Sequence, residues 1–171
     1  MKVILLGYMA SGKSSVGRLL AEKLGHDFID LDDEIASRIG MDIPAIFSKK
    51  GEIFFRKKET ETLIDILHGN SNLVLALGGG TPCYGNNMQI INASTPNSFY
   101  LKLTIPHLAV RLSAEKQERP LVANIPNKDL PEFIGKHLFE RTPFYNKANH
   151  TIEVNDKSLD EVVTELQQCL I

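Results

Sequence analysis

The first residues with recognisable chemistry lie in the stretch GYMASGKSS, which opens at Gly7. The stretch fits the pattern G-x-x-x-x-G-K-[ST], a loop whose backbone N–H groups converge on the phosphates of a nucleotide. In this pattern Lys13 neutralises the β- and γ-phosphate charges, and the Ser14 hydroxyl ligates Mg²⁺. The alternative is a chance match in a glycine-bearing turn, which the apolar run before the loop and the helical pattern after it argue against. The residues assigned to the nucleotide are Gly7, Ala10, Ser11, Gly12, Lys13, Ser14 and Ser15.

An acidic pair follows in the stretch Phe28-Ile29-Asp30-Leu31-Asp32. We interpret the stretch as the end of a strand, where a period of two puts Asp30 and Asp32 on one side, about 6.5 Å apart. Such a pair suits phosphoryl transfer, with Asp30 supporting Mg²⁺ through water and Asp32 orienting an acceptor hydroxyl. The alternative is that these acids only cap the following helix, which is the interpretation we prefer for Asp33.

Three consecutive glycines, Gly78-Gly79-Gly80, directly follow the apolar run that ends at Leu77. A run of glycines at the carboxyl end of a strand costs conformational entropy, and it is expected where a ligand approaches the backbone closely. The alternative is a plain packing turn, although such a turn needs only one or two glycines.

The elements that would position these motifs alternate between strand and helix along the chain. Apolar, β-branched runs predict strands that are covered on both sides, as in a parallel sheet. The predicted class is therefore α/β, a three-layer doubly wound parallel sheet of five strands, which binds ligands beyond the carboxyl ends of its strands. The expected strands are 3–6, 28–32, 73–77, 98–103 and 151–154, and the expected helices are 13–24, 33–39, 52–67, 105–113, 130–141 and 158–170.

Composition limits the function classes. The chain has 171 residues and a formal net charge of −2, which predicts a single domain over residues 1–171 and disfavours nucleic acid as a partner. Cys83 and Cys169 are far apart, and the histidines have no metal-binding spacing, so we expect neither a disulfide framework nor a zinc site. Gly7 interrupts the apolar N-terminal run too early for a signal peptide, and no run is long enough to span a membrane. We expect a soluble cytoplasmic protein that does not bind membranes.

The phosphate loop alone does not decide among switches, motors and small-molecule kinases. A guanine-binding switch would need Asn-Lys-x-Asp after a strand, whereas Asn127-Lys128-Asp129 has its aspartate one position early and precedes a helix. We therefore interpret that stretch as a coincidental loop.

Taken together, the motifs resemble those of shikimate kinase, a member of the nucleoside monophosphate kinase-like group of P-loop proteins. They occur in the family's order and at close to its spacing, and they extend over nearly the whole chain. The matching motifs are Gly7 to Ser14, Asp30-x-Asp32, Phe54-Phe55-Arg56, Gly78-Gly79-Gly80, Arg119-Pro120-Leu121 and Arg141-x-Pro143-x-Tyr145.

The resemblance implies transfer of the γ-phosphate of ATP to the 3-hydroxyl of shikimate, giving shikimate 3-phosphate in chorismate and aromatic amino acid biosynthesis. It implies a monomer that uses ATP as co-substrate with Mg²⁺ held at Ser14 and Asp30, and catalysis by Lys13, Asp32 and Arg119. Guanidinium groups pair bidentately with carboxylates, which agrees with a clamp on the substrate's acid group. The residues implied to bind shikimate are Asp32, Arg56, Gly78, Gly79, Gly80 and Arg141, with Phe47 and Phe55 near the ring.

A polar connection of about residues 113–126 resembles the family's lid, and residues 33–61 resemble its acceptor-binding region. A closing lid would bring Arg119 to the γ-phosphate. In many relatives an arginine that flanks adenine lies seven residues before the lid arginine, but here that position is Leu112. The neighbouring Arg111 is the candidate for contacts with the base.

Each acceptor residue also has a structural interpretation. Arg56 could form a solvated surface ion pair with Glu52 or Glu59, and Arg141 could stabilise the C-terminal end of its helix. Phe47 and Phe55 could be simple core residues. Two alternative functions stay open at this point: a related kinase acting on another hydroxy acid such as gluconate, and a nucleotide-dependent switch that transfers nothing.

Overall fold

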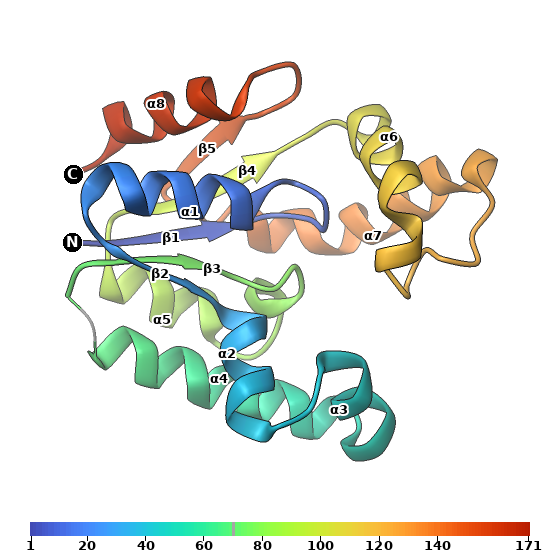
Figure 1. The fold of residues 1–171 in the computed structure, drawn as a ribbon, viewed down its shortest axis with the longest axis horizontal. Coiled ribbons are helices and arrows are strands. Elements are labelled where there is room, and N and C mark those ends of the chain that lie inside the picture. Colours follow the sequence, from blue (N-terminus) through green and yellow to red (C-terminus); the bar gives the residue numbers. More distant parts are fainter. Residues whose placement is uncertain (70) are drawn as a thin grey trace.

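The computed structural model describes residues 1–69 and 71–171, and its centre is one parallel sheet with strand order β2-β3-β1-β4-β5 (Figure 1). This confirms the predicted doubly wound, five-stranded α/β class. The strands are β1 (Lys2–Leu6), β2 (Asp27–Asp30), β3 (Leu73–Ala76), β4 (Ser98–Lys102) and β5 (His150–Glu153).

Helices cover both faces of the sheet, with α1 and α8 side by side on one face and α5 and α7 on the other (Figure 1). Single turns of 3-10 helix lie at Thr81–Cys83, Lys116–Glu118 and Asn127–Asp129. No helix within residues 1–69 and 71–171 is long and apolar enough to cross a membrane. The helices are α1 (Lys13–Leu24), α2 (Leu31–Ile39), α3 (Ile43–Lys50), α4 (Glu52–Gly69), α5 (Asn87–Ser94), α6 (Ile105–Glu115), α7 (Leu130–Tyr145) and α8 (Leu159–Cys169).

The register of β2, β3 and β1 brings the motifs together. Leu5 pairs with Ala76, and Ala76 pairs with Asp30, so β1, β3 and β2 end at the same level. The backbone N–H of Leu77 also donates to the carbonyl of Leu5, at 3.0 Å. The loop after β1, the glycines after β3 and the acids after β2 therefore leave the sheet next to one another.

The predicted strand 28–32 is wrong at its end. The β2 strand stops at Asp30, whose carboxylate accepts hydrogen bonds from the backbone N–H groups of Asp32 at 3.0 Å and Asp33 at 3.5 Å. Because this cap starts α2 at Leu31, Asp32 lies in the first helical turn rather than two positions along a strand. Asp30 is thus the cap, and Asp33 lies exposed in the first turn, where a negative charge is favourable.

Two short helices were not predicted. The α3 helix carries signals that sequence could have provided, since Asp42 caps it through the N–H of Ala45 and Pro44 lies in its first turn. The α5 helix has eight residues and begins with Asn87, so its pattern is too short and too polar to stand out.

The helices around the predicted lid extend further than expected. The α6 helix continues to Glu115, so it includes the start of the segment 113–126. The α7 helix continues through Pro143 to Tyr145 instead of ending near residue 141. Tyr145 is fully buried, and its hydroxyl donates to the carbonyl of Gly79 at 2.6 Å, so a tertiary contact stabilises the last turn despite the proline.

Candidate active site

The phosphate loop joins β1 to α1 in a backbone shape that its residue types explain. Gly7 has φ +150°, and a Cβ there would lie 2.7 Å from the carbonyl oxygen of Leu101. Gly12 has φ +91°, in the left-handed region that favours glycine. Ala10 also has a positive φ, of 62°, which is uncommon for a residue with a side chain and typical of functional loops. The loop leads into the N-terminus of α1, where free N–H groups favour anions.

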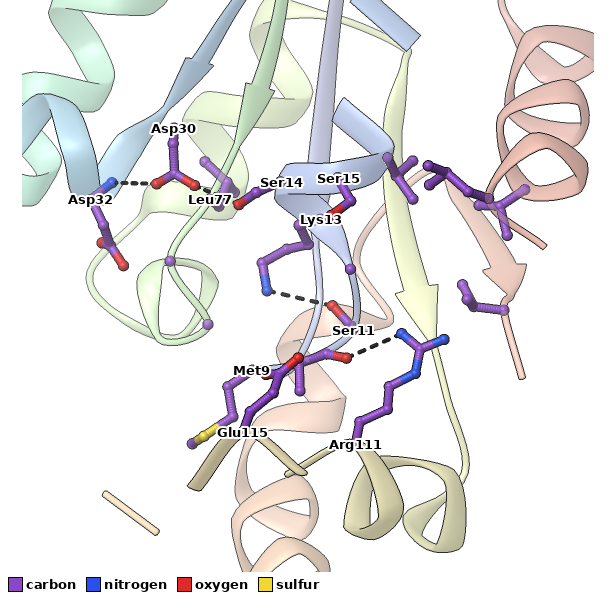
Figure 2. A pocket seen from close by; sticks show the side chains of 18 of the residues that line it. Met9, Ser11, Lys13, Ser14, Ser15, Asp30, Asp32, Leu77, Arg111 and Glu115 are labelled. Atoms are coloured by element: carbon purple, nitrogen blue, oxygen red, sulfur yellow. Dashed lines mark hydrogen bonds between the residues drawn. The ribbon is translucent and has the colours of Figure 1, made fainter. Parts of the chain in front are cut away.

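Lys13 is folded back over this loop (Figure 2). Its ammonium donates to the carbonyl oxygens of Gly7 and Tyr8, both at 2.9 Å. Burial lowers the pKa of Lys13 to about 8, against the opposing attraction of Asp32. The loop therefore holds a desolvated cation beside the position where the phosphates of a nucleotide would bind.

A side-chain hydrogen bond between Ser14 and Asp30 joins the start of α1 to the end of β2. The Ser14 hydroxyl donates to Asp30 Oδ2 at 2.6 Å, while Asp30 Oδ1 accepts from the backbone of Asp32 (Figure 2). Within residues 1–69 and 71–171, no group of three or more His, Cys, Asp or Glu could hold a metal ion. The pair suits a cation that brings most of its ligands with it, as Mg²⁺ does when it binds with phosphates and water.

The Asp32 carboxylate enters the same cavity as Lys13 (Figure 2). Burial, followed by repulsion from the carboxylates of Asp30 and Glu59, raises the pKa of Asp32 to about 6. This value lies close to physiological pH, where a carboxylate can both align a hydroxyl and accept its proton. The cavity has a volume of about 680 Å³ and extends from the phosphate loop to Gly78 and Gly79.

The far end of this cavity is lined by apolar and basic side chains. Val154, Leu159 and Val162 contribute apolar surface, and Lys157 lies beside them. These residues are not recognisable as site residues in the sequence, because apolar residues after a strand and in a helix resemble core residues. Arg111 also reaches the cavity, and its Nη1 donates to the carbonyl of Ala10 at 3.2 Å (Figure 2).

Leu112, which stands where the family resemblance implies an arginine, does not reach the cavity. Leu112 is fully buried in the core, whereas the preceding residue, Arg111, faces the cavity. Arg119 lines the cavity as well, and its Nε donates to Glu115 at 2.7 Å. Two cations thus lie near the loop in addition to Lys13.

Arg56 is held in a buried polar network. Its Nη1 donates to Glu59 at 2.9 Å, and its guanidinium carbon lies 3.8 Å from the centre of the Tyr84 ring. The Glu59 side chain is 1% exposed and that of Arg56 17%, so this pair is buried rather than solvated. The exposed Glu52 also lies 3.6 Å from Arg56 Nε, as the alternative of a surface pair expected. Glu59 also accepts a hydrogen bond from the Thr81 hydroxyl at 2.7 Å, which ties Arg56 to the turn after β3. From the sequence, Glu59 was expected only as a surface partner of Arg56, because an i, i+3 spacing does not reveal burial.

Arg141 differs from Arg56 because it pairs with no carboxylate within 4.0 Å in residues 1–69 and 71–171. Its guanidinium carbon lies 5.9 Å from the centre of the Tyr8 ring. The α7 helix runs on to Tyr145 and has no basic residue in its last turn, so the helix-end interpretation of Arg141 is wrong. The side chain is therefore a cation available to an anionic ligand.

The two arginines do not line the 680 Å³ cavity. They lie against the glycine turn, with Arg141 beside Gly79 and Arg56 beside Gly80. The structure therefore brings Lys13, Asp32 and the glycines together around one cavity and puts the arginines immediately next to it.

The two phenylalanines lie beside Arg56 but differ in exposure. Phe47 and Phe55 pack with ring centres 4.6 Å apart. Phe55 is 3% exposed and belongs to the core, whereas Phe47 is 37% exposed and could also contact a ligand.

Comparison with known proteins gives consistent results. A family model described as shikimate kinase matches residues 9–171. A shikimate kinase from Flavobacterium psychrophilum is 41% identical to this chain over 169 residues, which cover 99% of this chain and 98% of the relative.

Solved structures give the same result. This chain is similar to a crystal structure of shikimate kinase from Bacteroides thetaiotaomicron, with a TM-score of 0.91 and 31% identity over 98% of this chain and 97% of that one. It is also similar to a shikimate kinase from Acinetobacter baumannii in complex with shikimate, with a TM-score of 0.85 and 32% identity over 98% of this chain and 90% of that one.

Proposed function

Because the chain belongs to the shikimate kinase family, and is thereby an ATP-dependent shikimate kinase, we propose how its residues divide the reaction among them. The observation that carries the proposal is the cavity that contains both Lys13 and Asp32 next to the glycine turn and two arginines. The family match confirms the kinase prediction over a switch, and shikimate over gluconate as acceptor.

The phosphate loop binds the donor. Its N–H groups and the N-terminus of α1 take the β-phosphate, and Lys13 moves from the carbonyls of Gly7 and Tyr8 to the phosphate oxygens. The Ser14 hydroxyl and Asp30 would hold Mg²⁺, which supplies charge neutralisation between the β- and γ-phosphates when bound. Arg111, Lys157 and the apolar wall at Val154 hold the adenosine part of ATP.

Asp32 aligns the acceptor. Its carboxylate accepts a hydrogen bond from the 3-hydroxyl of shikimate and directs that oxygen at the γ-phosphorus, and it takes the proton as transfer proceeds. The raised pKa of Asp32, caused mainly by burial, supports this role because it matches the basicity of the group to physiological pH. Arg119, on the segment 113–126, closes over the γ-phosphate and shields it from water.

Arg56 and Arg141 bind the carboxylate of shikimate. Arg141 supplies a cation without a carboxylate partner in the described chain, and Arg56 supplies one whose position is set by Glu59. Two guanidinium groups on one carboxylate orient the ring, so that only one hydroxyl faces Asp32. The residues 33–61, with Phe47 at the edge of the ring, form the acceptor-binding region.

The contact between the arginines and the carboxylate can be tested by removing the charge from the substrate or from the enzyme. We expect shikimate methyl ester to show a higher KM than shikimate in the wild-type enzyme, by about tenfold or more. Arg141→Ala should raise the KM for shikimate to a similar extent but leave the KM for the ester nearly unchanged. An Arg141→Ala variant that weakens both substrates equally would contradict a contact between Arg141 and the carboxylate.

We also propose that the enzyme acts as a cytoplasmic monomer on small molecules. The two cysteines, Cys83 and Cys169, are free thiols, which supports a reducing compartment. A net charge of −2 supports small-molecule substrates over nucleic acid. Light scattering coupled to size exclusion would test the monomer, and an acceptor panel of shikimate, gluconate and nucleoside monophosphates would test how strict the acceptor choice is.

A further inference from the structure

The backbone of the glycine turn Gly78–Gly80 does not itself require glycine. None of the three has a φ in the left-handed region, and Gly80 has φ −89° and ψ −15°, an ordinary helical conformation. Gly7 and Gly12 differ from them in this respect, with φ +150° and +91°. Because no φ in the turn is positive, the space that side chains would fill is a better reason for three glycines than a left-handed backbone.

Each missing side chain leaves space for a different charged group. A Cβ on Gly78 would lie 2.8 Å from Asp32 Oδ1, its nearest neighbour, and 3.1 Å from the Thr81 hydroxyl, and a Cβ on Gly80 would lie 2.8 Å from Arg56 Nη2. A Cβ on Gly79 would lie 3.0 Å from Arg141 Nη1. At 2.8 Å the contacts at Gly78 and Gly80 would force the charged group to move, and at 3.0 Å the contact at Gly79 would displace Arg141 by a few tenths of an ångström.

The three charged groups are those to which we assign the acceptor. We propose that Gly78, Gly79 and Gly80 are positioning residues, and that the absent side chain of each sets the place of one group: Asp32, Arg141 and Arg56 respectively. This inference rests on the proposed roles of those three groups. It explains why the run contains three glycines, since each spaces a separate group and none can be replaced without moving one.

The neighbours of Arg56 show why displacement would matter. Its guanidinium is confined on the other side by Glu59 at 2.9 Å and by the Tyr84 ring at 3.8 Å. A Cβ on Gly80 would lie within 3.2 Å of three guanidinium atoms, so the whole group would be pushed from its partners. Each crowded atom is at the end of a side chain, so we expect the fold to persist while the reactive geometry changes.

Steady-state kinetics of three variants test the inference. We expect Gly78→Ala to lower kcat by about 100-fold, with the KM for shikimate changed less than about threefold, because displacing an aligning group by about 1 Å costs this much. Gly79→Ala and Gly80→Ala should instead raise the KM for shikimate by about tenfold, because they displace the groups that bind its carboxylate. The KM for ATP should stay the same in all three.

Gly135→Ala is the matched control, because a Cβ there meets only the Ile105 side chain at an ordinary 3.5 Å. We expect its kinetics to equal those of the wild type. If Gly78→Ala and Gly80→Ala show the same pattern of kcat and KM, or if both match the control, the inference is wrong.

A double-mutant cycle separates spacing from direct contact between the glycines and the substrate. In an Arg56→Ala background the crowded guanidinium is gone, so Gly80→Ala should change the KM for shikimate by less than about twofold. An equal fold-change in both backgrounds would mean that the added methyl group acts on shikimate itself, and would overturn the inference. A failure of the proposed role of Arg56 is distinguishable, because Arg56→Ala alone would then leave the KM unchanged.

Thermal unfolding of the substrate-free proteins gives a readout that does not depend on activity. If Gly80→Ala lowers the melting temperature, the inference predicts that adding Arg56→Ala removes this further loss. Independent, additive losses would contradict it even if Gly80→Ala is too unstable for kinetics.

Discussion

Replacing Asp32 by Asn should make the substrate-free enzyme more stable while it removes activity. Burial and two neighbouring carboxylates raise the pKa of Asp32 from 3.8 to about 6, so the folded protein disfavours the ionised form. At about 1.4 kcal/mol for each tenfold change, this corresponds to about 3 kcal/mol at a pH above 6. Asn keeps the size of the side chain without the charge. We expect a gain of about 1–3 kcal/mol in the free energy of unfolding, because water at the cavity screens part of the effect.

The dependence of this gain on pH follows from the direction of the shift. Below about pH 3.8 the carboxyl group is protonated in both the folded and the unfolded protein, so Asp and Asn should be equivalent there. The penalty on Asp32 grows between about pH 4 and pH 6 and is complete above pH 6. Chemical denaturation of protein free of nucleotide and Mg²⁺, at pH 4 and at pH 8, measures both ends of this range.

Asp33→Asn is the matched control, since Asp33 lies in the same helical turn but is exposed. It should lose only the favourable interaction of an acid with the helix N-terminus, about 0.3–1 kcal/mol, which Asp32→Asn also loses. The difference between the two variants therefore isolates the buried charge. An Asp32→Asn variant that is less stable than wild type at pH 8, or equally stabilised at both pH values, would refute the reasoning.

The activity of Asp32→Asn completes this test. We expect kcat to fall by about 10²–10⁴-fold, because the variant can no longer accept the proton of the acceptor hydroxyl. ATP affinity should be retained, since Asp32 makes no hydrogen bond through its carboxylate to the phosphate loop in the described chain. Equal loss of turnover and of nucleotide binding would contradict the assigned role.

Three further predictions concern the cations and their partners. Arg141→Ala should raise the KM for shikimate by about tenfold or more with little change in the KM for ATP, and unchanged acceptor kinetics would exclude it from the carboxylate site. Arg119→Ala should lower kcat by about 10²-fold or more with little change in the KM for shikimate, as rapid-quench measurement of phosphoryl transfer would show. Glu59→Gln should lower the free energy of unfolding in urea by about 2–4 kcal/mol, because it removes the buried charge partner of Arg56 and leaves only the exposed Glu52 at 3.6 Å; stability within about 0.5 kcal/mol of wild type would show that the pair with Glu59 is dispensable.

The amino-acid sequence was sufficient for the features that depend on neighbours along the chain. The apolar runs of β1 and β3 predict buried parallel strands, and the residue types from Gly7 to Ser14 predict the phosphate loop. The predicted helix 158–170 is present as α8, which starts with a capping box formed by Ser158 and Glu161. These features rely on backbone geometry, side-chain periodicity and short-range hydrogen bonds, which adjacent residues determine.

Tertiary structure alone decided the environment of the charged groups. The i, i+3 spacing of Arg56 and Glu59 suits a surface pair, but the packing of α4 buries Glu59 against Thr81. Asp32 was predicted on a strand, yet the cap formed by Asp30 places it in the first turn of α2. From there its side chain lines the same cavity as Lys13. The purpose of the three glycines is invisible in sequence, because the groups that occupy their space come from α2, α4 and α7. The burial of a charged group, and therefore its pKa and its interaction energies, depends on which distant segments the sheet brings together. The spacing of residues along the chain does not reveal this.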